Sequence, residues 1–169
     1  MSKNLIVFSH GLESGPWGSK ITRMAEVAKA QGADVESVDY QGMRSPDERV
    51  EKLLTRLSAL GDEHVILVGS SMGGHVATAA AAEKPVAGLF VLAPAFHMPG
   101  FEALTPQPPS CPMEIVHGWH DDVVPVDNSI RFARAAAIPL HIVDSDHRLA
   151  SALPVICQLF ERFIMEIQQ

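Results

Sequence analysis

Two patterns of apolar residues alternate along the chain. Short continuous apolar runs are typical of strands that are buried on both faces of a sheet. Segments in which apolar residues recur every three to four positions are typical of helices with one buried face. The first pattern predicts strands at residues 4–8, 34–40, 64–68, 86–93, 113–116 and 139–143. The second pattern predicts helices at residues 19–31, 46–57, 76–82, 126–137 and 149–167.

Two stretches carry strong local signals. Before the second predicted helix, Ser45 can cap the first turn, Pro46 suits the first helical position, and Glu48 completes a capping pattern. Residues 94–112 contain six prolines, so no single regular element can span them. We expect an ordered loop there, with a turn of helix near residues 101–104.

The alternation of strands and helices predicts an α/β fold. Right-handed strand–helix–strand units give a mostly parallel sheet covered on both faces, here a six-stranded three-layer α/β/α sandwich. No linker or internal repeat divides the chain, so residues 1–169 are expected to form a single domain. Ligands of such sheets bind beyond the carboxyl ends of the strands. Polar clusters follow four predicted strands, at residues 9–12, 69–73, 117–122 and 144–147.

The cluster at residues 69–73 reads Gly-Ser-Ser-Met-Gly and lies between a predicted strand and a predicted helix. This G-x-S-x-G pattern is typical of a nucleophile elbow, a tight turn that exposes a serine hydroxyl above the sheet. By chance the pattern arises about once in twenty chains of this length. Its position between a strand and a helix makes Ser71 the candidate nucleophile.

A serine nucleophile needs a base, and the base needs a carboxylate that orients it. After Ser71, Asp121 and its neighbour Asp122 follow the fifth predicted strand, and His147 follows the sixth. The order Ser, Asp, His is the one used by a known hydrolase fold. Spacing from His117-Gly118 favours Asp121, and Asp122 remains the alternative, the other carboxylate then leading the next helix.

With these motifs, the chain resembles the α/β-hydrolase superfamily, as a small lidless member similar to bacterial carboxylesterases. The resemblance covers nearly the whole chain and includes Ser9-His10-Gly11-Leu12 after the first strand. It implies that Ser71 is the nucleophile, Asp121 the orienting acid and His147 the base. It also implies that the backbone N–H groups of Leu12 and Met72 form the oxyanion hole, and that no cofactor is needed.

The chain departs from the superfamily in lacking an antiparallel N-terminal pair of strands and any stretch long enough for a cap domain. An open site is therefore expected, with substrate choice left to the loop side chains Trp17, Phe96, Met98 and Trp119. The expected reaction is hydrolysis of a small-molecule carboxylic ester or thioester through an acyl-enzyme. The rival interpretation is a non-catalytic binding protein that uses the open cleft for a small ligand or a protein partner.

The other histidines are less suited than His147 to act as the base. His64 and His141 begin strands at the wrong edge of the sheet, and His10 is expected to be a structural hydrogen-bonder of the oxyanion loop. His75, on the helix after the elbow, is expected to pack or cap. The run from His117 through His120 to Asp122 admits a zinc site, but it lacks the helical H-E-x-x-H pattern. No metal is therefore expected.

Composition excludes several classes of function. With 47% hydrophobic residues the chain can bury a core without metal or disulfides, and Cys111 and Cys157 are expected to stay reduced and inert in a cytoplasmic setting. No secretory segment and no apolar run of membrane-spanning length occurs. The net charge is −7 without a basic stripe, so neither nucleic acid nor membrane is an expected partner.

Overall fold

The computed structural model describes residues 3–61 and 63–168. The strands in this part of the chain are β1 (Asn4–Ser9), β2 (Asp34–Val38), β3 (His64–Ser70), β4 (Gly88–Leu92), β5 (Met113–Gly118) and β6 (Leu140–Val143). The α-helices are α1 (Ser19–Ala30), α2 (Pro46–Ser58), α3 (Met72–Glu83), α4 (Val126–Ala136) and α5 (Leu153–Gln168). Two short 3₁₀ turns, η1 (Glu102–Leu104) and η2 (Ala150–Ala152), complete the elements.

The six strands form one fully parallel sheet in the order β2-β1-β3-β4-β5-β6. β1 pairs with β2 on one side and with β3 on the other, so the direction in which successive strands are added reverses between β1 and β3. In open α/β sheets this reversal leaves a crevice between the loops that follow the two strands, and ligands bind there. The loop after β1 and the residues after β3 are thus the expected place for a site.

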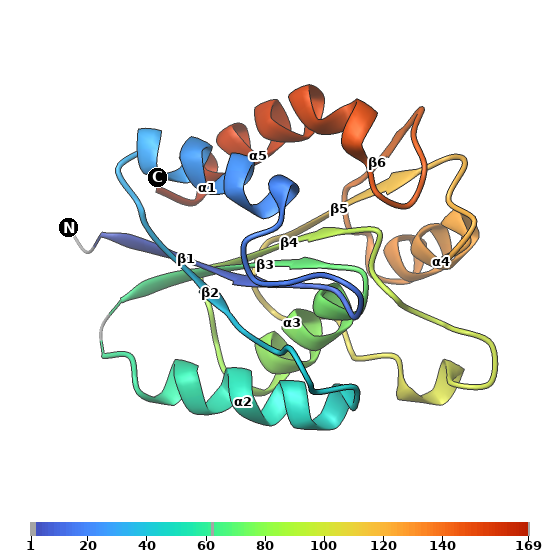
Figure 1. Ribbon diagram of the computed structural model, residues 1–169, viewed down its shortest axis with the longest axis horizontal. Coiled ribbons are helices and arrows are strands. Elements are labelled where there is room, and N and C mark those ends of the chain that lie inside the picture. Colours follow the sequence, from blue (N-terminus) through green and yellow to red (C-terminus); the bar gives the residue numbers. More distant parts are fainter. Residues whose placement is uncertain (1–2, 62, 169) are drawn as a thin grey trace.

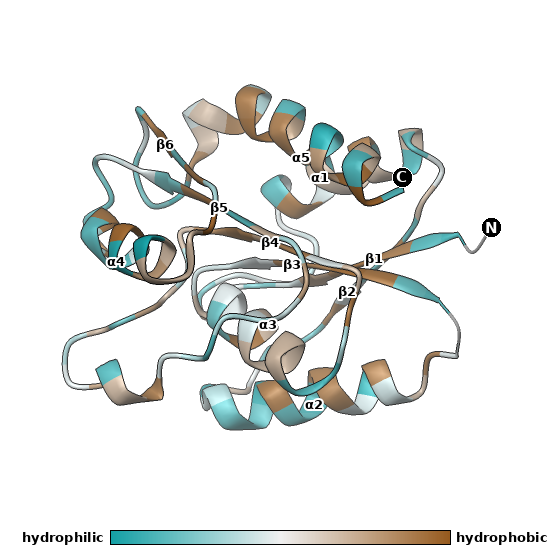
Figure 2. Ribbon diagram, turned by 180° about the vertical axis from the view of Figure 1, so that it is seen from behind, coloured by the Kyte–Doolittle hydropathy of each residue, from teal (hydrophilic) through white to brown (hydrophobic). Residues whose placement is uncertain are grey.

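Helices cover both faces of the sheet, which confirms the predicted three-layer sandwich (Figure 1). α1 and α5 lie on one face, where Ile6 and Phe8 of β1 point into the core. α2, α3 and α4 cover the other face, where Leu5 and Val7 are buried. Figure 2 shows hydrophobic colour along the central strands and alternating hydrophilic and hydrophobic patches on α2, as expected of a helix with one buried side.

The capping prediction at the start of α2 is confirmed. The Ser45 hydroxyl accepts a hydrogen bond from the Glu48 amide, and Pro46 is the first helical residue. Between β4 and β5, η1 is the one regular element of the proline-rich loop, close to the helical turn expected at residues 101–104. No cap domain stands over the sheet in the described residues, so its carboxyl edge is covered only by loops.

Several element boundaries differ from the predictions, and three of the differences have a local structural cause. α3 begins at Met72, directly after the elbow and not at residue 76. β2 ends at Val38, because the amide of Tyr40 donates to the ring of His10 and so leaves the sheet ladder. The last α-helix begins at Leu153, since Leu149 adopts a positive φ of 61° and η2 intervenes.

The two ends of the described chain lie at the amino edge of the sheet. β1 begins there at Asn4, and the last turns of α5 contact the start of β4, where Phe163 and Ile167 lie against Gly88. Figure 1 shows both ends on the side away from the loops that follow the strands. No helix in residues 3–61 and 63–168 is both long enough and apolar enough to cross a membrane.

Candidate active site

Ser71 occupies the tight turn between β3 and α3. Its backbone has φ 55° and ψ −120°, a combination that few residues other than glycine adopt and that costs about 1–3 kcal/mol. A Cβ atom at Gly69 would collide with the carbonyl of Gly73, so the end of β3 and the start of α3 approach each other too closely for a side chain at Gly69. The turn therefore requires glycine at this position. It presents the Ser71 side chain at the carboxyl edge of the sheet.

His147 and Asp121 complete a continuous hydrogen-bonded chain with Ser71. The Nε2 atom of His147 lies 3.1 Å from the Ser71 hydroxyl, and its Nδ1 atom lies 2.7 Å from Oδ2 of Asp121. Because the carboxylate can only accept, Nδ1 carries the proton and Nε2 accepts from the serine hydroxyl. Such an arrangement can remove the proton from a serine that attacks an electrophile.

Asp121 is held by amide donors as well as by His147. Its Oδ1 atom accepts hydrogen bonds from the amides of Val123 and Val124, both at 2.8 Å, and its side chain is fully buried. Burial raises the pKa of Asp121, but the hydrogen bonds from His147 and the two amides outweigh it and bring the pKa below its ordinary value. Asp122 is exposed, and the acidic residue in the first turn of α4 is Asp127, so the expectation that the second aspartate leads that helix is wrong.

His117, at the end of β5, also contacts Asp121, and the sequence did not indicate this. Its ring is fully buried, with Nε2 3.1 Å from Oδ2 of Asp121 and 2.8 Å from the carbonyl oxygen of Val124. The Ser129 hydroxyl lies 2.7 Å from Nδ1. Burial lowers the pKa of His117, so the neutral ring donates through Nε2 and accepts from Ser129. The available signal was its spacing of four residues from Asp121.

The loop after β1 is organised by His10. Its Nδ1 atom lies 2.8 Å from the carbonyl oxygen of Gly11, and its Nε2 atom accepts from the amide of Tyr40 at 2.8 Å. Since Tyr40 donates to Nε2, the proton of the neutral ring is on Nδ1. Burial lowers the pKa of His10, which favours this neutral form. His10 is therefore a structural hydrogen-bonder, as predicted.

This hydrogen bond fixes the direction of the next amide. In a planar trans peptide the carbonyl of Gly11 and the N–H of Leu12 point in opposite directions. The bond from His10 to that carbonyl therefore aims the Leu12 amide away from the His10 ring. Met72 opens α3, where the first amides have no intrahelical partner. Neither amide donates to a backbone carbonyl in the described part of the chain, so both can serve a ligand.

Lys20, in the first turn of α1, reaches the loop that carries His147. Its Nζ atom donates to the carbonyl of Arg148 at 3.2 Å. Burial lowers the pKa of Lys20 to about 8, although Asp121 and Asp146 oppose that shift. The contact ties α1 to the loop that carries His147, and no sequence pattern indicated it.

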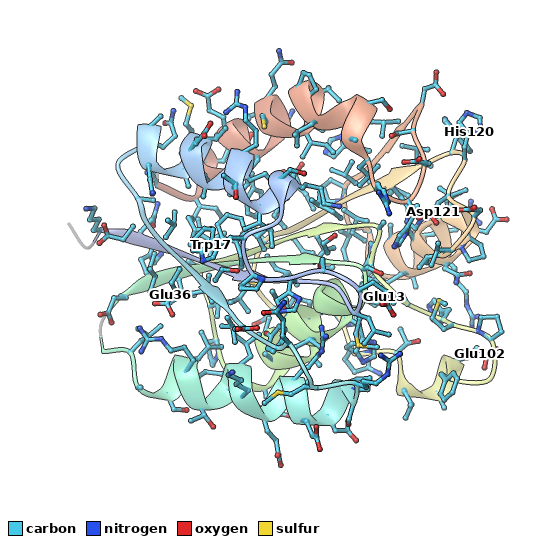
Figure 3. All side chains as sticks on the ribbon, viewed as in Figure 1. Glu13, Trp17, Glu36, Glu102, His120 and Asp121 are labelled. Carbon is cyan, nitrogen blue, oxygen red and sulfur yellow. The ribbon has the colours of Figure 1, made fainter. Side chains whose placement is uncertain are left out.

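The four residues predicted to line a substrate pocket do not lie together. Phe96 is fully buried and stacks on Phe132 at 4.1 Å, so it belongs to the core beneath α4 and its expected place in an exposed pocket is wrong. Trp17 packs beside Phe8, and Figure 3 shows it well apart from Asp121. Trp119 is 56% exposed and directly precedes the loop of Asp121, and Met98 is partly buried.

The remaining histidines have partners of their own. His64 contacts Asn4 and His141 contacts Glu114, both at the amino edge of the sheet, as expected. His120 is paired with Asp144 on the surface and not with His117. Within residues 3–61 and 63–168 no group of three or more His, Cys, Asp or Glu side chains is placed to hold a metal ion. Burial raises the pKa of both thiols, at Cys111 and Cys157, which disfavours their reactive form.

Comparison with known proteins identifies the family. Residues 6–162 match the sequence pattern described as "Alpha/beta hydrolase family". The chain belongs to the alpha/beta hydrolase family. A solved structure described as a hydrolase of the alpha/beta superfamily, from Xanthomonas campestris pv. campestris, is 30% identical to this chain. It has a TM-score of 0.88, over 98% of this chain and 99% of that one.

More distant solved structures share the fold. Est1E from Butyrivibrio proteoclasticus has a TM-score of 0.85 at 17% identity, over 98% of this chain and 88% of that one. An esterase from Pyrococcus furiosus has a TM-score of 0.79 at 16% identity, over 98% and 82% of the two chains. No curated protein matches the chain by sequence. Membership of the alpha/beta hydrolase family supports a hydrolase.

Proposed function

We propose that this alpha/beta hydrolase is a serine hydrolase that cleaves a carboxylic ester or thioester through an acyl-enzyme. The observation that carries the proposal is the continuous chain from the Ser71 hydroxyl through His147 to buried Asp121, with contacts of 3.1 and 2.7 Å. A serine exposed at an elbow and hydrogen-bonded to an oriented imidazole is the arrangement that acyl transfer requires.

In the first half of the reaction, the Ser71 oxygen attacks the acyl carbonyl while Nε2 of His147 takes the hydroxyl proton. The carbonyl oxygen becomes an oxyanion and accepts hydrogen bonds from the amides of Leu12 and Met72. The imidazolium then gives its proton to the departing alcohol or thiol as the carbon–oxygen or carbon–sulfur bond breaks, which leaves the acyl group on Ser71.

In the second half, water attacks the acyl-serine and gives one proton to His147. Collapse of the second oxyanion releases the carboxylic acid and returns that proton to the Ser71 oxygen. Asp121 stays ionised throughout and stabilises the imidazolium, in agreement with its lowered pKa. An oxyanion donor is typically worth about 3 kcal/mol in such a step, so a misdirected Leu12 amide should slow the reaction by about 100-fold. The mechanism requires no cofactor.

A fluorophosphonate probe tests the proposal directly, because it forms a covalent bond only with an activated serine. We expect the wild-type protein to be labelled at Ser71 and the Ser71→Ala variant to remain unlabelled, with hydrolysis of p-nitrophenyl acetate lost in parallel. A folded wild-type protein that is neither labelled nor active would instead favour the non-catalytic binding protein. Parallel series of acyl esters and acyl thioesters would then identify the leaving group.

For the acyl side, we propose that two loop residues, the exposed Trp119 and the partly buried Met98, contact the substrate. Trp119→Ala should change the preference among p-nitrophenyl esters of different chain length, because it removes apolar surface near the site. Phe96→Ala serves as the matched control: it should lower the stability of the core by about 3–5 kcal/mol and leave that preference unchanged. An unchanged preference in Trp119→Ala would contradict this assignment.

A further inference from the structure

Arg49 is a buried cation outside the chain of residues that the proposed reaction uses. It lies in the first turns of α2, and its side chain is among the largest that are wholly buried, with 1% of its surface exposed. No carboxylate lies within ion-pairing distance of its guanidinium in the part of the chain that the structure describes. Burying a charge without an opposite charge is costly, so its neighbours must compensate in another way.

Backbone carbonyls and an aromatic ring provide that compensation. The Nε atom donates to the carbonyl of Met43 at 2.9 Å, and Nη1 donates to the carbonyl of His10 at 2.9 Å. The Tyr40 ring lies below the guanidinium, with 4.9 Å between Cζ and the ring centroid. Through these two hydrogen bonds the planar guanidinium of Arg49 links the loop after β1 to the loop after β2. Both loops lie at the edge of the sheet that carries Ser71.

The carbonyl that Arg49 holds lies at the root of the oxyanion loop. It belongs to His10, whose ring in turn holds the next carbonyl, at Gly11, and so sets the direction of the Leu12 amide. The same carbonyl touches the elbow from the other side, since a Cβ atom at Gly73 would collide with the carbonyls of Ser9 and His10. The position of the His10 carbonyl thus sets the orientation of the loop after β1, which contains Leu12, relative to α3, which begins at Met72.

We propose that Arg49 is a positioning residue for the oxyanion hole, because it anchors the His10 carbonyl and so aligns the Leu12 amide with that of Met72. The proposal rests on the proposed serine hydrolase function. The loss of Arg49 should weaken stabilisation of the oxyanion, which develops only during reaction, and should affect binding of the substrate much less.

The test compares Arg49→Met and Arg49→Lys with Leu53→Ala in the full-length protein. Leu53 lies one turn further along α2, is fully buried and makes no polar contact with the loop. We expect Arg49→Met to lower kcat for p-nitrophenyl acetate by about 100-fold, as small misplacements of catalytic groups do, and to change KM less than about three-fold. The inhibition constant of a trifluoromethyl ketone, whose adduct places an oxyanion in the hole, should rise by a similar factor.

Arg49→Lys should retain an intermediate kcat, since an ammonium can reach one carbonyl but cannot hold both in a fixed fork. Leu53→Ala should lower the melting temperature and leave kcat near that of the wild type. If Arg49→Met fails to fold, the lysine variant alone carries the test. Equal losses of kcat in Leu53→Ala and the Arg49 variants, or a loss confined to KM, would overturn the proposal.

A structural measurement separates this proposal from the reaction on which it rests. If the wild-type protein proves inactive towards esters and unlabelled by the fluorophosphonate, the proposed function fails. A crystal structure of Arg49→Met would still show whether the Gly11–Leu12 peptide turns from its wild-type orientation. A peptide that keeps its orientation would overturn the role of Arg49, whatever the activity.

Discussion

Asp121 receives three hydrogen bonds and a further contact from His117, and this explains why one of two adjacent aspartates is suited to the site. Two amides hold Oδ1, while the rings of His147 and His117 share Oδ2. Such a carboxylate is fixed in both position and charge. Asp122, one residue later, is exposed to solvent and has no comparable set of donors in the structure.

We predict that Asp121→Asn lowers kcat by about 10⁴-fold with little change in fold, because the amide can no longer hold His147 in the required tautomer. Asp122→Asn is the matched control and should retain nearly full activity. Steady-state kinetics on p-nitrophenyl acetate, with circular dichroism as the check of folding, measures both. The reverse pattern would transfer the role of acid to Asp122.

At the level of residues, the sequence predicted the members of the hydrogen-bonded chain but not their supports. Ser71, Asp121 and His147 could be chosen because each follows a predicted strand and their order matches a known fold. His117 and Arg49 could not, since burial and contact partners give them their place. Arg49 meets the His10 carbonyl across 39 residues of chain, a pairing that no local pattern contains.

Among the elements, the start of α3 is pressed against the end of β1. A Cβ atom at Gly73 would collide with the carbonyl of Ser9, and backbone atoms cannot move away as a flexible side chain can. The close approach brings the elbow and the loop after β1 into direct contact. It depends on the second glycine of the G-x-S-x-G motif.

We therefore predict that Gly73→Ala lowers the free energy of unfolding by about 3 kcal/mol or more and abolishes most esterase activity. Gly18→Ala is the control, because a Cβ atom there has no heavy atom within 4 Å and the backbone is not in a region that requires glycine. Urea denaturation of both variants measures the difference. A Gly73→Ala protein as stable as Gly18→Ala would show that the elbow can move away from β1.

Element types were predictable from periodicity, whereas several boundaries and the direction of one side chain were not. Glycine has a low helix propensity, so the glycines of the elbow make the first turn of α3 look non-helical in the sequence. The sequence therefore predicts a later start for this helix. Phe96 was expected to face the substrate because it follows a strand at the carboxyl edge. Its ring instead turns inward to stack on Phe132 of α4, and sequence does not give the direction in which a loop side chain points.

On the scale of the whole molecule, the alternation of strands and helices predicted the parallel sandwich but not the strand order. The position of β3 beside β1 follows from packing of the whole sheet, and it places the elbow next to the loop that follows β1. Buried imidazoles are a second property of the whole fold. Burial lowers the pKa of four of them, at His10, His75, His97 and His117.

Because the pKa of these four histidines is lowered in the folded protein, we expect the free energy of unfolding to decrease at acid pH. In the unfolded chain each takes up a proton near its ordinary pKa of 6.5, whereas the fold resists protonation until lower pH. The free energy of unfolding should therefore be highest above pH 6.5 and fall as the pH decreases below it. Urea titrations between pH 8 and pH 5 measure this dependence.

His117→Gln should flatten this dependence by up to about 1.4 kcal/mol per pH unit, because one group that differs between the two states is removed. Leu53→Ala, which lowers stability without removing a titrating group, should keep the wild-type slope. An unchanged slope in His117→Gln would mean that His117 takes up its proton equally well in the folded protein.

The amino edge of the sheet, where the described chain both starts and finishes, faces away from Ser71. A fusion partner or an affinity tag on either end would lie at the amino edge of the sheet. Attachment to a solid support by either end would leave the Ser71 hydroxyl directed towards the bulk solution. The two ends also share one edge, so a flexible linker could join them and new ends could be opened in the proline-rich loop after β4. The protein could thus be immobilised or circularly permuted without any change near the elbow.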